Sequence, residues 1–165
     1  MLHTIDEFAH TWEEESATTR KVLSQLTETS LAQEVIPGGR TLGRIAWHIA
    51  VSLGELTHRL GLGIDCPTEE GDVPGLETIR STYDRAAMTI SPRLREKWSD
   101  ADLTREFDMY GERWTGASAL QMLIRHEIHH RGQMTILMRQ AGLAVPGVYG
   151  PAREDWAQWG MEAPR

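Results

Sequence analysis

Apolar residues recur at helical spacing in four stretches of the chain, with polar residues between them. These stretches cover residues 4–27, 41–61, 76–98 and 115–141. Apolar residues three and four positions apart form one face of a helix, and that face has to be buried against another element. Four such helices, with no strand pattern between them, predict an all-α fold class and a four-helix bundle.

Turn and capping residues indicate where these helices begin and end. Thr41 follows the turn residues 37–39 (Pro-Gly-Gly) and is suited to be the N-cap of the second helix. Gly142 is suited to end the fourth helix. Pro92 lies inside the third stretch after Ser91, and it is expected to kink or restart that helix.

The second and third helices are joined by a long polar link. Residues 65–75 contain Pro67 and Pro74 together with Gly71 and Gly75, so no regular element is expected there. A helix of ~20 residues spans ~30 Å, and a link of about 15 residues can cover that distance. The second and third helices are therefore expected to run parallel, which gives an up-down-down-up order.

The other two connecting regions are less regular in pattern. Between residues 99 and 116, the spacing of the aromatic residues allows a short hairpin around Gly111. From Leu143 to the C-terminus the chain is expected to be mostly irregular, with one or two helical turns at residues 153–159.

Composition narrows the class of protein. The 165 residues, 40% hydrophobic and 25% charged, are ordinary for a globular protein, and a single domain covering residues 1–165 is expected. The one cysteine, Cys66, excludes an intrachain disulfide framework, and no secretory signal is recognised, so a cytoplasmic protein is expected. No apolar run approaches the ~20 residues that span a bilayer, which predicts no membrane partner. A net charge of −7 disfavours binding to phosphate backbones, so no nucleic-acid partner is expected.

Two histidines four residues apart are the strongest chemical signal in the sequence. His126 and His130 lie in the fourth apolar stretch, and on a helix they are separated by about 40° and one turn, so both can reach one cation. Neutral imidazoles are costly to bury without a partner, and a divalent ion would offset that cost. This spacing predicts a metal site.

Residues 126–130 also match the His-Glu-x-x-His signature of zinc proteases, in which the glutamate activates water. Such enzymes need a third ligand downstream and a larger scaffold, yet no histidine follows His130. A protease is therefore disfavoured, and the third ligand has to come from upstream. The upstream histidines are His3, His10, His48 and His58.

Among these histidines, His48 has the better orientation. It lies about 100° from the centre of the apolar stripe of the second helix, whereas His58 points almost directly away from that centre. The alternative is that His48 is a half-buried polar residue that is hydrogen-bonded to a neighbour. Orientation alone leaves both interpretations open.

Three segments resemble the DinB/YfiT-like superfamily: residues 41–50 (TLGRIAWHIA), residues 126–133 (HEIHHRGQ) and residues 145–151 (VPGVYGP). The resemblance extends over nearly the whole chain. It implies a four-helix bundle with a long crossover, often dimeric, that binds one divalent metal ion through three histidines. Carried over to this sequence, the metal ligands would be His48, His126 and His130.

Members of this superfamily resemble enzymes that use low-molecular-weight thiols, and a three-histidine site leaves coordination positions open for chemistry. The leading hypothesis is a metal-dependent S-transferase that activates a small-molecule thiol for attack on an electrophile. The alternatives are a metal-assisted hydrolase and a non-catalytic metal-binding protein of the stress response. Zinc and nickel are the favoured metals, although imidazole also suits iron and copper. A homodimer is expected from the resemblance alone.

Four further residues near these motifs have open roles. Glu127 is expected to form a salt bridge rather than to reach a metal-bound water. His129 is expected either to be solvated or to support a ligand, or else to act as a ligand itself, and Gln133 either to support a ligand or to serve helix packing. Cys66 is expected to be an exposed and unreactive thiol.

Overall fold

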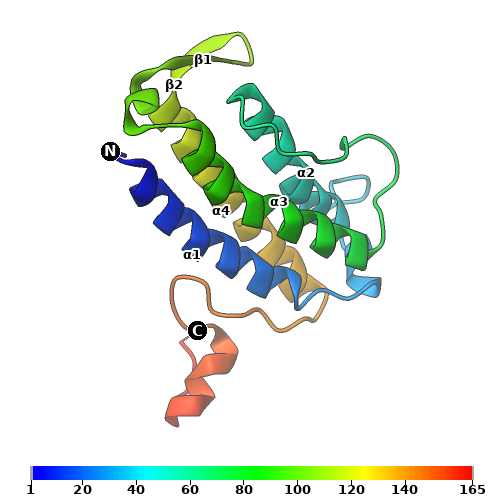
Figure 1. Ribbon diagram of the computed structural model, residues 1–165. Coiled ribbons are helices and arrows are strands. Elements are labelled where there is room, and N and C mark those ends of the chain that lie inside the picture. The colour runs from blue at the N-terminus through cyan, green and yellow to red at the C-terminus, as the bar shows by residue number, and fades with distance from the viewer. Residues whose placement is uncertain (1, 165) are drawn as a thin grey trace.

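The computed structural model describes residues 2–164, and most of these residues are helical. The long helices are α1 (Ile5–Leu23), α2 (Leu42–Arg59), α3 (Leu76–Lys97) and α4 (Gly116–Gln140). Each of α1 and α2 packs against both α3 and α4, as Figure 1 shows. Their apolar faces enclose one core that includes Phe8, Trp12, Ile49, Ile90 and Leu123.

Hydroxyl caps explain why three of these helices begin where they do. The side chain of Thr4 accepts a hydrogen bond from the backbone N–H of Glu7, and Glu7 reaches back to form a capping box. Thr41 and Thr115 cap α2 and α4 in the same way, by accepting from Arg44 and Ser118. Thr41 therefore has the capping role that its position in the sequence predicted.

Helix α1 ends at Leu23, four residues before the predicted end. The Arg80 guanidinium of α3 donates hydrogen bonds of 3.0 to 3.1 Å to the backbone carbonyls of Leu23, Ser24 and Leu26. These carbonyls would lack intrahelical partners at a helix end, and Arg80 supplies them with donors. A distant residue therefore stabilises the end of α1, which the local pattern could not show.

Helix α3 is continuous through Pro92, so the predicted restart at Ser91 is wrong. Proline removes one N–H and leaves the carbonyl four residues earlier without its helical donor. Pro92 and Met88 are both exposed, so water can hydrate that carbonyl.

The link between α2 and α3 folds back along α2. Leu62 donates its backbone N–H to the carbonyl of Thr57 near the end of α2, whereas the carbonyls of Glu69 and Gly71 accept from Arg44 near its start, at 2.9 and 2.7 Å. In between, Cys66 packs directly on Gly54, where a Cβ atom would lie 2.9 Å from the Cys66 Sγ. The link thus lies against α2 over most of that helix.

A two-stranded hairpin interrupts the helical order, so the strictly all-α prediction has to be amended. Strands β1 (Glu106–Met109) and β2 (Glu112–Thr115) are antiparallel, with Phe107 opposite Trp114. Tyr110 and Gly111 form the turn, with φ angles of 61° and 85°. The hairpin that the sequence allowed around Gly111 is confirmed.

The tail follows the predicted course. Residues 143–152 are irregular, and a short 3₁₀ helix follows at Arg153–Trp159. Lys21 of α1 donates to the carbonyl of Gly147 at 3.1 Å, and Figure 1 shows the tail passing below the ends of α1 and α4.

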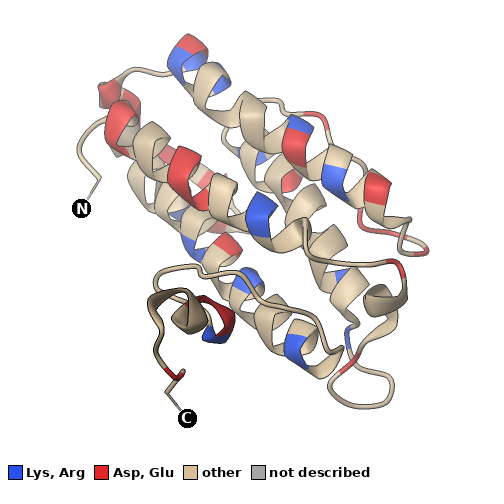
Figure 2. Ribbon diagram, turned by 90° about the horizontal axis from the view of Figure 1, so that it is seen from below, with Lys and Arg blue, Asp and Glu red and all other residues tan. Residues whose placement is uncertain are grey.

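Charge is distributed along α1 in the sense that stabilises a helix. Asp6 and Glu7 lie in its first turn and Arg20 and Lys21 in its last turn. In Figure 2 the helix that begins beside the N label is red at its start and blue toward its other end. Acidic groups favour the positive N-terminal end of the helix dipole and basic groups its negative end. Among residues 2–164, no helix is both long and apolar enough to cross a bilayer.

Candidate metal centre

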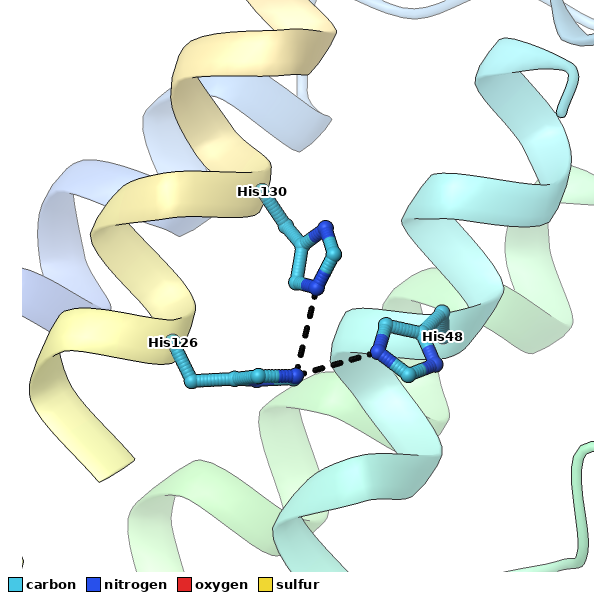
Figure 3. A group of neighbouring side chains, drawn as sticks. All are labelled: His48, His126 and His130. Carbon is cyan, nitrogen blue, oxygen red and sulfur yellow. Dashed lines mark hydrogen bonds between the residues drawn. The ribbon is translucent and has the colours of Figure 1, made fainter. Parts of the chain in front are cut away.

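Three histidines from two helices converge on one point. One ring nitrogen from each of His48, His126 and His130 lies within 4.8 Å of the others. The Nε2 atom of His126 is 3.1 Å from Nε2 of His48 and 3.2 Å from Nε2 of His130. Figure 3 shows His126 and His130 reaching from successive turns of α4 toward His48 on α2. The structure therefore brings together the three residues that the sequence selected.

The outward nitrogens of two rings are fixed by other side chains. The Nδ1 atom of His48 lies 2.6 Å from a carboxylate oxygen of Glu69. The Nδ1 atom of His130 lies 2.7 Å from Oε1 of Gln133. An ionised carboxylate and an amide oxygen only accept hydrogen bonds, so each Nδ1 carries the proton. The Nε2 lone pairs of His48 and His130 are consequently directed toward the common centre.

This arrangement of lone pairs fits a cation. A neutral His126 can carry a proton on Nε2 and donate it, but to only one of its two neighbours. The Nε2 atom of His126 would then face the Nε2 atom of its second neighbour with no proton between the two nitrogens. A divalent ion accepts all three lone pairs, and imidazole nitrogens are common ligands of zinc and nickel. The donor set in the structure is thus chemically suited to a metal.

Two of the three rings, those of His126 and His130, are also held in the neutral state that ligation requires. Burial, and next the neighbouring His130, lower the pKa of His126 to about 4. Burial also lowers the pKa of His130. A group with a lowered pKa binds no proton near neutral pH, so protons would not compete with a metal ion there.

The other histidines lie outside this cluster. His3 and His58 are exposed, and His10 forms a pair with Glu14 at 3.5 Å on the surface. His129 is exposed, and its Nε2 lies 3.2 Å from the amide nitrogen of Gln133. His129 thus contacts the group that orients His130.

Glu127 occupies neither of the positions that the sequence suggested. Its side chain is only 1% exposed and accepts a hydrogen bond from the Tyr83 hydroxyl of α3. Burial raises the pKa of this carboxyl group. The predicted salt bridge is wrong because Glu127 lies in the core, and the same placement keeps it from the water-activating role of zinc-protease glutamates.

The residue that sequence reasoning missed is Glu69. Its position in a polar link beside Glu70 gives no periodic or motif signal that distinguishes the two. The pairing with His48 arises because Arg44 holds the adjacent backbone and Gly54 lets the link approach α2. Cys66, predicted to be exposed, is partly buried at that contact, and burial raises the pKa of its thiol.

Comparisons with known proteins show the family to which this chain is similar. The sequence model of the DinB family matches residues 1–161. YrdA of Bacillus subtilis (strain 168) is 43% identical over 166 residues, which cover 100% of this chain and 99% of YrdA. YjoA of the same organism is 33% identical over 70 residues, 41% of this chain and 43% of YjoA.

Two solved structures are similar to this fold. A DinB-like protein from Bacillus cereus ATCC 10987 superposes with a TM-score of 0.86 at 43% identity, over 90% of this chain and 100% of that chain. The DinB-like protein YjoA of Bacillus subtilis has a TM-score of 0.64 at 18% identity, over 82% of this chain and 92% of that chain, which shows a shared fold.

Proposed function

Because the chain belongs to the DinB family and brings three histidine nitrogens to one point, we propose that it binds one divalent metal ion through His48, His126 and His130. The observation that carries this proposal is the convergence of the three Nε2 atoms, with the outward Nδ1 atoms of His48 and His130 held by Glu69 and Gln133. Partners of this kind fix the tautomer and ring orientation of metal-binding histidines.

The proposal includes the topology of the bundle. We infer that α1 to α4 form a four-helix bundle in up-down-down-up order, with the link of residues 60–75 as the crossover. Its support is the path of the link, which starts at the end of α2 and returns to Arg44 near the start of that helix. The crossover has a chemical consequence, because it carries Glu69 back to His48.

We propose that the activity is the transfer of a small-molecule thiol to an electrophile. In this reaction the sulfur forms a bond to the electrophilic carbon, the leaving group departs with its electron pair, and the thiol proton goes to solvent. A bound divalent cation would supply the positive charge that favours the deprotonated form of the thiol. Three protein ligands leave room for a small molecule to reach such an ion.

The protein side chains prepare this site in three ways. Burial keeps His126 and His130 neutral, Glu69 and Gln133 fix the ring orientations, and the half-buried position of the cluster limits water around it. A metal-assisted hydrolase has less support, because the Glu127 carboxylate is bonded to Tyr83 and cannot serve as a general base at this site.

Metal content tests the first step of the proposal. We would purify the protein without a histidine tag and measure bound metal by elemental analysis after competition with a chelator. About one ion per chain is expected in the wild type, with loss in His48→Ala and in His126→Ala. The matched control is His58→Ala, which removes an exposed histidine from the same helix as His48. Equal metal content in His48→Ala and the wild type would contradict the proposed ligand set.

Activity tests the second step. Metal-loaded protein would be incubated with 2-aminoethanethiol and 1-chloro-2,4-dinitrobenzene, and the thioether product would be followed by absorbance. Faster product formation than with metal-free protein, and than with His126→Ala, is the expected result. Metal binding without any acceleration, across a panel of bacterial thiols, would favour the non-catalytic alternative.

A further inference from the structure

A cavity of about 380 Å³ opens directly beside the three-histidine cluster. His48 and His126 form one end of it. The rest of its wall comes from α2, the hairpin and α4, through Ser52, Glu55, Leu56, Tyr110, Trp114 and Met122. This volume lies at the small end of the range for small-molecule sites, about 300 to 1,000 Å³. The cavity therefore suits a compact ligand that can also reach the histidines.

The chemistry of the wall restricts the kind of ligand. Leu56, Met122 and the two aromatic side chains make it mainly apolar, and Glu55 is its one carboxylate. No lysine or arginine lines it within residues 2–164. The Arg59 guanidinium, which is not part of the wall, lies over the Tyr110 ring with Cζ 4.1 Å from the ring centroid. An anionic ligand body would meet Glu55 without a compensating cation in the wall, whereas an apolar or cationic body would be accommodated.

The hairpin holds the two aromatic side chains in place. Phe107 stacks on Trp98 with ring centroids 4.9 Å apart, and Trp114 is the cross-strand partner of Phe107. The indole N–H of Trp114 donates to Glu112 at 2.7 Å. Tyr110 has a φ angle of 61°, as the two-residue turn between β1 and β2 requires, and this turn fixes where its side chain leaves the hairpin. Burial, and next the Glu55 carboxylate, raise the pKa of Tyr110.

We propose that this cavity binds the apolar, uncharged or cationic body of the thiol substrate, and that Trp114 and Tyr110 select it by contact with an aromatic or aliphatic group. The inference rests on the proposed metal-dependent thiol chemistry and deepens it, because it names the class of thiol. Small aromatic thiols are bound better than small polar ones, and aminothiols better than thiols that carry a carboxylate.

The contribution of the aromatic wall is measured with two thiols that differ in their apolar group. The protein is loaded with cobalt(II), and phenylmethanethiol or 2-mercaptoethanol is titrated while the thiolate-to-cobalt absorption band is recorded. Phenylmethanethiol is expected to bind at least about tenfold tighter, the ratio that corresponds to 1.4 kcal/mol. Trp114→Ala and Tyr110→Ala each reduce this ratio, because they weaken the binding of phenylmethanethiol more than that of 2-mercaptoethanol. The matched control is Trp159→Ala, which removes a tryptophan that is 56% exposed on the tail.

The contribution of Glu55 is measured with 2-aminoethanethiol and mercaptoacetate. The wild type is expected to favour 2-aminoethanethiol severalfold, and Glu55→Gln to reduce this preference. The matched control is Glu77→Gln, which neutralises an exposed carboxylate on α3 and should keep the wild-type preference.

The outcomes separate this inference from the proposed function. Failure of the wild type to bind cobalt would overturn the metal proposal and this inference together. Cobalt binding with an equal affinity for phenylmethanethiol and 2-mercaptoethanol, in the wild type and in both aromatic variants, would overturn this inference alone. Tyr110 is 51% exposed, so Tyr110→Ala gives a folded test protein even where Trp114→Ala does not.

Discussion

Helix α4 carries two polar clusters on different sides, and they are built in different ways. On the side that faces α2, His126 and His130 direct ring nitrogens toward His48. On the side that faces α1, the Arg131 side chain is 1% exposed and donates to the Glu15 carboxylate and to the Thr19 hydroxyl. The Tyr149 hydroxyl of the tail contacts both Arg131 and Glu15, at 2.6 and 2.7 Å.

The difference lies in how each cluster is satisfied. Every charge in the cluster of Arg131, Glu15 and Tyr149 has a protein partner, so that cluster stabilises the fold without any bound group. In the histidine cluster, only the outward nitrogens of His48 and His130 have partners that fix their protons. A polar cluster whose inward acceptors outnumber the available protons indicates a binding site, whereas a cluster with complete pairing indicates a structural role.

The largest effect is expected from Arg131→Met. Removing one partner of a buried ion pair leaves the Glu15 carboxylate with the Tyr149 hydroxyl but without its cation, which should lower the free energy of unfolding by about 3–5 kcal/mol. Urea denaturation of metal-free protein would measure this loss. The metal content per folded chain should stay at the wild-type value, because the three histidines are unchanged.

The matched comparison is His130→Ala, because His130 is next to Arg131 in the sequence but lies on the other side of α4. It should lose the bound metal and cost metal-free protein much less stability than Arg131→Met does. The reverse result, with His130→Ala the more destabilising of the two in metal-free protein, would remove the distinction between the two clusters.

An intermediate effect is expected from Glu69→Ala, which tests how the histidine cluster is held. Loss of a group that orients a metal-binding histidine typically weakens metal affinity about 10-fold to 100-fold. Glu69→Gln retains an oxygen that can accept a hydrogen bond from Nδ1 of His48, so it should lose less metal affinity than Glu69→Ala. Chelator competition would measure both. Glu70→Ala is the control, since it removes the adjacent and exposed carboxylate, and an equal loss there would argue against a specific role for Glu69.

The smallest effect is expected from Tyr149→Phe, and it depends on pH. Losing two hydrogen bonds to charged partners at the surface should cost about 0.5–1.5 kcal/mol at pH 7. Burial, and next the Glu15 carboxylate, raise the pKa of Tyr149 from 10 to about 12. The unfolded chain therefore releases this proton at lower pH than the folded chain, so the stability contribution is lost as pH rises from 10 to 12.

The measurement is urea denaturation of metal-free wild type and Tyr149→Phe at pH 7, 10 and 12. The difference in stability between the two proteins should shrink across the alkaline range. A difference that stays constant from pH 7 to 12 would show that the phenol proton is not linked to folding.

The apolar pattern of residues 115–141 was strong enough to predict helix α4. It also predicted that His126 and His130 could bind one metal ion, because their spacing alone places them on one face. His48 needed the family resemblance, since its angle on α2 left a simpler interpretation open. The N-cap at Thr41 and the turn at Gly111 were also predicted from the sequence, because the conformational preferences of such residues act within a few positions.

What the sequence could not predict depends on contacts between distant segments. Arg80 ends α1 from another helix, and Tyr83 draws Glu127 into the core from a position 44 residues away. Glu69 and Glu70 are chemically equivalent in the sequence, and only the register of the link against α2 determines which one meets His48. Such pairings follow from the packed structure and leave no local periodicity.

The close contact between Gly54 and Cys66 has a consequence for which mutations this protein can tolerate. A methyl group at Gly54 would lie 2.9 Å from the Cys66 Sγ and 3.2 Å from the carbonyl oxygen of Ile64, so the link would have to move away from α2. Glu69 lies three residues beyond Cys66 in that link and would move with it, away from His48. The proposed metal affinity would therefore constrain Gly54, a residue with no functional group of its own, through the position of Glu69.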